Sequence, residues 1–237
     1  MAGSDKTMDD YIDTFIIFWL KGRVSDGWID QGMINNYASR PGLEGVFTSI
    51  SVDWEFPGWR ANGNDYSIDD GKRLAKFLRR LKEKTKAAMG KDYLISVAIS
   101  GDPAKMGLDE EAYQESPNDN SKANPAFDYN KLQKPTEWHK YCDEIHVMAY
   151  DYMGAYDPCP GPQANLYESN DPSAVGSTLE LSGKEDYSTA KAFYYLVDVC
   201  GIDKKKIHFG LPFYGRGWTL SDVNNGAVDG YYNFTGR

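Results

Sequence analysis

Residues 49–57 read SISVDWEFP, and polar and apolar side chains alternate along them. Successive side chains of a β-strand point to opposite faces of the sheet. The odd-numbered residues from Ser49 to Glu55 are all polar, and the even-numbered residues from Ile50 to Phe56 are all apolar. A strand of a helix-covered parallel sheet is normally apolar on both faces. The polar row therefore predicts a strand with one face open to a cavity or to solvent.

Two acidic residues, Asp53 and Glu55, end this polar row. Parallel sheets and barrels place their active sites at the carboxyl ends of the strands, where these two residues should lie. At the usual rise of a strand their Cα atoms are roughly 6.6 Å apart. Two acids at that spacing suit general acid catalysis. The alternative is a solvated face of an edge strand, but the apolar opposite face and the alternation of elements favour a site.

The rest of the chain predicts an α/β fold with about four parallel strands. Strand-like and helix-like segments alternate from about residue 45 onward, which is typical of a parallel sheet. We expect strands at 46–55, 93–100, 144–151 and 206–213. Helices are expected from a capping box at Ser67 and Asp70 to Gly90, around 134–141, and over 188–200, where Phe193, Leu196, Val197 and Cys200 share a face.

The N-terminal residues fit this pattern less well. Ile12, Phe15, Ile16 and Trp19 define one helical face that ends at Gly22, and no convincing strand precedes residue 45. The first ten residues lack the features of a signal peptide, and the longest apolar run, 15–20, is too short to cross a membrane.

The composition of the chain restricts the classes of molecule that it can bind. The chain has 237 residues and a formal net charge of −9, which argues against nucleic acid and anionic membranes. His139, His146 and His208 lack metal-ligand spacing, so neither a metal nor a cofactor is expected. Cys142 and Cys200 should both lie at the end of the sheet away from the acids, and two buried thiols are favoured there over a disulfide.

Three motifs in order resemble family 18 glycoside hydrolases, the chitinase family. Residues 48–57 resemble its catalytic signature, D-G-x-D-x-D-x-E followed by Tyr or Phe and Pro. Residues 148–151 resemble its Met-x-Tyr-Asp sixth strand, and residues 210–216, GLPFYGR, resemble its seventh. The resemblance covers about residues 45–218. It implies part of a TIM-type (β/α) barrel, in which our four strands are the fourth to the seventh.

The resemblance also implies a reaction on β-1,4-linked N-acetylglucosamine, as in chitin or its oligosaccharides. Glu55 would protonate the glycosidic oxygen, while the carbonyl of the substrate's own acetamido group attacks the anomeric carbon. Asp53 would orient the acetamido group and stabilise charge on its nitrogen, and Tyr150 would donate a hydrogen bond to its oxygen. Asp151 would contact the same sugar. Further substrate contacts are implied at Met148, Tyr214, Arg216 and Trp59, although Trp59 would serve equally well in the core.

Two departures separate the chain from this family. Thr48, Ser49 and Ser51 stand where the signature has Asp, Gly and Asp, and Ser51 cannot carry the charge of the middle carboxylate. We expect weakened rather than abolished hydrolysis. The barrel is also incomplete: 1–44 are an atypical N-terminal segment, 45–218 the partial barrel, and 219–237 the start of a truncated insertion. Open barrel edges of this kind favour self-association.

Other functions stay open from the sequence. A chitin- or glycan-binding protein that has lost turnover is favoured by Thr48 and Ser51. An endoglycosidase that acts on N-glycans would use the same site, and a fragment that does not fold alone would have no activity. The resemblance implies an extracellular protein, although no signal peptide is recognised in the sequence.

Overall fold

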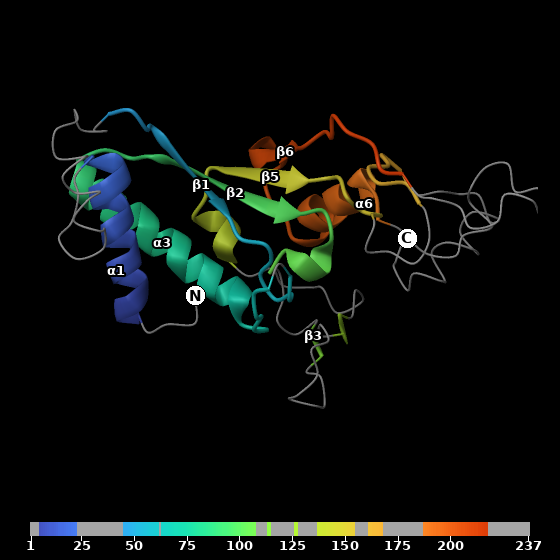
Figure 1. The fold of residues 1–237 in the computed structure, drawn as a ribbon, viewed down its shortest axis with the longest axis horizontal. Coiled ribbons are helices and arrows are strands. Elements are labelled where there is room, and N and C mark those ends of the chain that lie inside the picture. Colours follow the sequence, from blue (N-terminus) through green and yellow to red (C-terminus); the bar gives the residue numbers. More distant parts are fainter. Residues whose placement is uncertain are drawn as a thin grey trace, which may run out of the picture.

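The computed structural model describes residues 5–22, 45–61, 63–107, 113–114, 126–127, 137–154, 161–167 and 187–217. Its main feature is a sheet of four parallel strands in the order β1, β2, β5 and β6 (Figure 1). The bounds are β1 (Ser49–Asp53), β2 (Leu94–Ser100), β5 (Glu144–Met148) and β6 (Ile207–Phe209). A separate antiparallel pair consists of β3 (Tyr113–Gln114) and β4 (Ala126–Phe127). The four expected strands are all present, and β1 and β6 are the outer strands of this sheet among the described residues.

Three of these strands are clearly shorter than the sequence predicts. β1 begins at Ser49, which pairs with Leu94, the first residue of β2. β5 ends at Met148, which pairs with Ser100, the last residue of β2. The ends are therefore set by where a neighbouring strand is available. β6 stops before Pro212, which has no N–H to donate to a ladder.

The helical elements follow the expected order. They are α1 (Asp5–Phe15) with the π-helix η1 (Ile16–Leu20), α3 (Asp70–Met89), and α6 (Thr189–Phe193) with the π-helix η7 (Tyr194–Val199). Short 3₁₀ turns are η2 (Pro103–Lys105), η5 (Glu137–Lys140) and η8 (Lys204–Lys206). Residues 23–44 and 219–237 of the predicted N-terminal and insertion segments lie outside the described residues. In the described parts, no helix has both the length and the apolar character that a membrane span requires.

The two faces of the sheet differ in polarity, as the alternation in residues 49–53 predicts. The outer face is apolar and covered by helices; its side chains at Ile95, Val97, Ile99, Ile145 and Val147 are at most 1% exposed. They form one core with Leu74, Leu78 and Leu81 of α3 and Leu196 of η7. On the other face, which we call the open face, Ser51, Asp53 and His146 are exposed. The polar row of β1 therefore faces solvent.

Two predicted helix faces need correction, and a π-helical turn explains both. Ile12, Ile16 and Leu20 are at most 2% exposed, whereas Trp19 is 44% exposed. The wider turn of η1, in which the Lys21 N–H donates to the Ile16 carbonyl, brings Leu20 rather than Trp19 under Ile16. In the same way, η7 leaves Phe193 37% exposed while Leu196 and Cys200 are buried.

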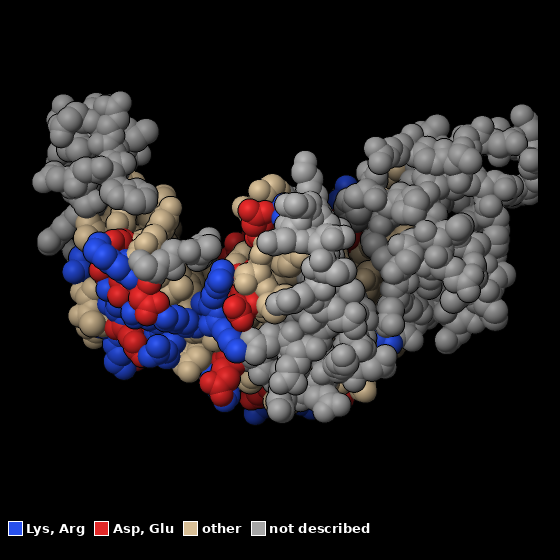
Figure 2. Space-filling model, turned by 90° about the horizontal axis from the view of Figure 1, so that it is seen from below, with Lys and Arg blue, Asp and Glu red and all other residues tan. Residues whose placement is uncertain are grey.

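Charged side chains connect α1 to α3 around an apolar contact. Lys84 pairs with Asp13 at 2.9 Å, Arg80 pairs with Asp9 at 3.3 Å, and Lys76 pairs with Asp5. Figure 2 shows basic and acidic residues interleaved on the side of the molecule that it faces. Because exposed ion pairs contribute little each, the buried face of α1 dominates its attachment.

Candidate active site

Asp53, Glu55 and Tyr150 lie at the carboxyl end of the sheet. Asp53 is the last residue of β1 and Glu55 follows two residues later, while Tyr150 stands two residues after β5 ends. After Leu94, its first residue, the intervening strand β2 presents small side chains to the open face, at Ser96, Ala98 and Ser100, and Ala98 pairs with Asp53. These small residues leave room between the side chains of β1 and β5. Nothing in the sequence pattern marks these positions as part of a site.

The phenol of Tyr150 interacts electrostatically with both acids. Burial raises the pKa of its phenol, and the charges of Asp53, Asp151 and Glu55 raise that pKa further. The hydroxyl of Tyr150 therefore stays protonated at neutral pH and remains a hydrogen-bond donor. The acids at and just after the end of β1 and the phenol after β5 thus act on one another although they are far apart in the chain.

Asp151 forms a second group with two further predicted site residues. Arg216 donates from Nε and Nη2 to the Oδ1 of Asp151, at 2.8 and 2.6 Å. Burial first, and then a hydrogen bond to Asp151, raises the pKa of Tyr214. The rings of Tyr150 and Tyr214 meet edge to face with centroids 6.4 Å apart. The structure therefore brings four predicted residues into one continuous group beside the acids.

Two residues that support this group were missed by the sequence analysis as site residues. The Gln163 amide donates to the Tyr214 carbonyl at 2.7 Å. A Cβ at Gly210 would lie 2.8 Å from the Cε1 of Tyr150, so this position has no room for a side chain. The glycine was recognised only as part of the 210–216 motif, because the sequence does not reveal which ring packs against it.

The loop after β1 is fixed by a buried carboxylate. Asp70, whose residue is 3% exposed, accepts backbone N–H groups of Ser67 at 2.8 Å and Gly58 at 3.2 Å. Burial is the main cause that raises the pKa of Asp70, and the two N–H donors oppose it. The predicted capping box is only half formed, because the Ser67 hydroxyl accepts from Asp69 rather than from Asp70. Asp70 therefore joins the start of α3 to the loop that carries Glu55.

The remaining predicted residues are partly buried near the same end of the sheet. Met148 ends β5 on the open face, where it pairs with Ser100. Trp59 lies in the loop after β1, with the Lys105 ammonium 5.4 Å from its ring centroid. That ammonium also pairs with Asp102 at 3.2 Å. One neighbour of the Trp59 ring is therefore a cation from η2.

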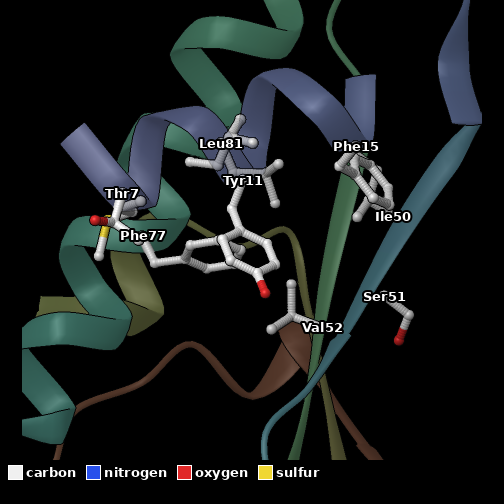
Figure 3. Close-up of a pocket in the computed structure, with 10 residues that line it drawn as sticks. Thr7, Tyr11, Phe15, Ile50, Ser51, Val52, Phe77 and Leu81 are labelled. Atoms are coloured by element: carbon white, nitrogen blue, oxygen red, sulfur yellow. The ribbon is translucent and has the colours of Figure 1, made fainter. Parts of the chain in front are cut away.

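A separate apolar pocket lies on the opposite side of β1. Figure 3 shows it between α1, α3 and β1, with Ser51 pointing away from it. Its volume is about 480 Å³, and the acids do not line it. Its apolar lining includes Met8, Tyr11, Phe15, Ile50, Val52, Phe77 and Leu81. The candidate site is therefore on the open face and distinct from this pocket.

The cysteines and histidines take structural positions in the described part of the chain. Cys142 and Cys200 are buried thiols that form no disulfide, as expected, and burial raises the pKa of Cys142 to about 11. His146 lies 3.2 Å from Glu144 and meets His208 edge to face. The described residues contain no group of three or more His, Cys, Asp or Glu side chains that could hold a metal ion.

Comparison with known proteins gives consistent matches. The model of glycosyl hydrolases family 18 matches residues 31–236. A chitinase of Autographa californica nuclear polyhedrosis virus is 29% identical over 200 residues, which are 81% of this chain and 29% of that protein. Chitinase 2 of Yersinia entomophaga is 30% identical over 182 residues, which are 75% of this chain and 24% of that protein. The chain thus spans less than a third of the length of these relatives.

Solved structures match the fold. The catalytic domain of psychrophilic chitinase B from Arthrobacter TAD20 is 24% identical, with a TM-score of 0.64 over 99% of this chain and 46% of that chain. Ostrinia furnacalis Group IV chitinase in complex with allosamidin is also 24% identical, with a TM-score of 0.57 and the same coverage. At these identities the likeness establishes the fold, a partial TIM-type (β/α) barrel. Because the family model covers most of the chain, this protein belongs to the family 18 glycosyl hydrolases.

Proposed function

We propose that the chain is a glycosidase of the chitinase type that cleaves β-1,4-linked N-acetylglucosamine polymers. One observation carries the proposal: Asp53, Glu55 and Tyr150 lie at the carboxyl end of the sheet, and the charges of both acids raise the pKa of the phenol. The relatives named above are chitinases, and this supports the choice of substrate. We also propose that the reaction takes place outside the cell, as the family resemblance implies.

In the proposed reaction the substrate supplies the nucleophile. Glu55 gives its proton to the glycosidic oxygen as the carbonyl oxygen of the acetamido group bonds to the anomeric carbon. In the same step the bond from the anomeric carbon to the leaving sugar breaks, and its electron pair stays on the protonated oxygen. Water then attacks the anomeric carbon of the cyclic intermediate, whose bond to the acetamido oxygen breaks, and the Glu55 carboxylate takes up the proton from that water, which restores the acid.

Each neighbouring residue has a part in this scheme. Asp53 stabilises the positive charge that develops on the acetamido nitrogen. The Tyr150 hydroxyl, kept protonated by its raised pKa, donates to the acetamido oxygen. Asp151 contacts the same sugar, and Arg216 fixes the orientation of its carboxylate. Met148, Tyr214 and Trp59 complete the proposed substrate surface.

We propose that hydrolysis is slow, because Ser51 replaces a carboxylate. Ser51 is exposed on the open face, one strand repeat before Asp53. Its hydroxyl can bond to Asp53 but cannot share a charge with it. The same feature, together with Thr48, favours the second candidate function, a protein that binds chitin or a related glycan without cleaving it.

Release of a fluorophore from a chitobioside separates the two functions. We expect slow release by the native chain and none by Glu55→Gln, because the amide cannot give up a proton. Glu144→Gln is the matched control, since Glu144 lies at the other end of the open face and should not affect release. Chitin retention without Glu55-dependent release would favour the binding protein, and release that survives Glu55→Gln would contradict the proposed acid.

A further inference from the structure

A turn over residues 56–59 comes directly after Glu55. The Trp59 N–H donates to the Phe56 carbonyl at 3.2 Å. Gly58 has a φ of 77°, and a type II turn requires such a positive φ at its third residue. The rings of Phe56 and Trp59 thus belong to the two ends of one turn. A contact that holds both rings therefore also restrains the backbone next to Glu55.

The ammonium group of Lys105 lies over both of these rings. Its Nζ is 5.9 Å from the centroid of the Phe56 ring and 5.4 Å from that of the Trp59 ring. A cation within about 6 Å of an aromatic centroid is attracted by the negative face of the ring. One charge from the segment after β2 therefore bridges the two ends of the turn.

Asp102 holds this ammonium group in place. Its Oδ2 pairs with the Lys105 Nζ at 3.2 Å, while its Oδ1 accepts the Ala104 N–H at 3.0 Å. The N–H of Asp102 donates to the Ser100 hydroxyl at 3.1 Å, and the residue is 3% exposed. Because a buried charge needs a partner of opposite sign, this carboxylate restricts the flexible side chain of Lys105.

The segment that carries Lys105 also packs against the turn. A Cβ at Gly107 would lie 2.8 Å from the Cβ of Pro57 and 3.1 Å from the Cα of Gly71 in α3. Residues 101–107 therefore lie beside the turn (Figure 1), and all of them are buried except Lys105, which is partly buried. Lys105 thus extends from a packed support toward the two rings.

We propose that Lys105, held by Asp102, is a positioning residue for Glu55. It restrains the turn through Phe56 and Trp59, so that the Glu55 carboxyl group stays directed at the glycosidic oxygen. A displacement of roughly 1 Å at a reacting group can lower a rate by about 10². This inference rests on the hydrolysis proposed above, but one of its two tests is independent of turnover.

Turnover of the fluorogenic chitobioside is the first test. Lys105→Met keeps most of the apolar side chain but removes the charge, so kcat should fall by about 10² while KM changes much less. Lys105→Arg keeps a cation and should recover most of the rate. Lys91→Met is the matched control, because the Lys91 ammonium lies 5.1 Å from the ring centroid of Tyr93, just before the amino end of β2. Both constants should stay native in this control.

Three results of this test would overturn the proposal. The first is a native kcat in Lys105→Met, or a change in KM alone. The second is an equal fall of kcat in Lys91→Met. The third is a loss in Lys105→Arg as large as that in Lys105→Met, because the positive charge would then not be what restrains the turn.

Hydrogen exchange is the second test and needs no substrate. The Trp59 amide, which is bonded within the turn, should exchange several-fold faster in Lys105→Met than in the native chain. The Gly90 amide donates to the Lys86 carbonyl at the end of α3 and is the internal reference, which should be unchanged. Unchanged exchange at Trp59 would overturn the proposal. If the native chain releases no fluorophore, the proposed hydrolysis fails, and exchange at Trp59 still decides whether Lys105 restrains the turn.

A double variant keeps both tests usable if Lys105→Met fails to fold, which circular dichroism would reveal. The single change leaves the charge of Asp102 buried without this partner. Adding Asp102→Asn removes that charge, and the amide oxygen can still accept the Ala104 N–H. The double variant should show the same loss of kcat and the same faster exchange at Trp59. Native values for both would overturn the proposal.

Discussion

Gly210 illustrates how one missing side chain positions a predicted site residue. A Cβ there would lie 2.8 Å from the Tyr150 ring and 3.3 Å from the Val147 carbonyl oxygen. Gly210→Ala should therefore push Tyr150 away from the acids and lower kcat more than it changes KM. Gly215→Ala is the matched control, because nothing lies within 4 Å of its Cβ position. Equal turnover in both variants would show that the position of Tyr150 is unimportant.

Ser51 is the residue at which the signature departs most in chemistry. Ser51→Asp restores a carboxylate beside Asp53 on an exposed strand position, so it should raise the rate of glycoside hydrolysis by about 10², the scale of an acid–base step. Ser49→Asp adds the same charge two residues earlier on the same face and should leave the rate unchanged. An unchanged rate in Ser51→Asp would count against the assigned role of this position.

Asp70, at the start of α3, makes the stability of the folded protein depend on pH. Its pKa is raised above the ordinary 3.8, so the folded protein binds the proton more tightly than the unfolded chain does. The free energy of unfolding should therefore fall as pH rises from about 4 through the raised pKa. Asp70→Asn removes this contribution and still accepts a backbone N–H. Urea unfolding at about pH 4 and about pH 7 should show a smaller fall in the variant than in the native chain; identical falls would contradict this account.

The attachment of α1 rests on its apolar face. Ile16 is 2% exposed in the common core, so Ile16→Ala should lower the free energy of unfolding by about 2 to 4 kcal/mol. Trp19→Ala, at a 44% exposed position of the same helical segment, should have a clearly smaller effect. Urea denaturation would measure both. Equal losses would mean that the π-helical turn does not separate the two residues as described.

Helices and strands could be predicted from the sequence where local periodicity determines them, but not where contacts between distant residues determine them. The alternation from Ser49 to Asp53 indicated both the strand and its open face, because side chains alternate in any strand. The strand ends were wrong, since β1 begins only where Leu94 is available to pair. Trp19 was misplaced because a π-helical turn depends on packing. The bond from Gly58 to Asp70 joins residues whose contact no local pattern reveals.

At the scale of the whole molecule, the reactivity of the buried thiols measures how readily the core opens. Cys142 and Cys200 are buried, and the pKa of Cys142 is raised to about 11, so its thiol stays protonated at neutral pH. With Cys159, the third cysteine of the sequence, replaced by serine so that only these two thiols can react, their alkylation should be slow in the native state and follow unfolding in urea. Rapid alkylation without denaturant, at the rate of a free thiol, would show that the core opens without cooperative unfolding.

The serine hydroxyls along β1 and β2 also affect how molecules of this protein associate in solution. A sheet surface of this composition is readily wetted, so it can remain in contact with solvent without drawing other molecules onto it face to face. Exposed apolar side chains do lie beside the outer strands, at Val46 and Phe47 before β1 and at Leu211 after β6. Any unwanted clustering of this protein should therefore grow sideways, along the direction of the backbone hydrogen bonds, and respond to substitutions at the margins rather than to changes among the serines.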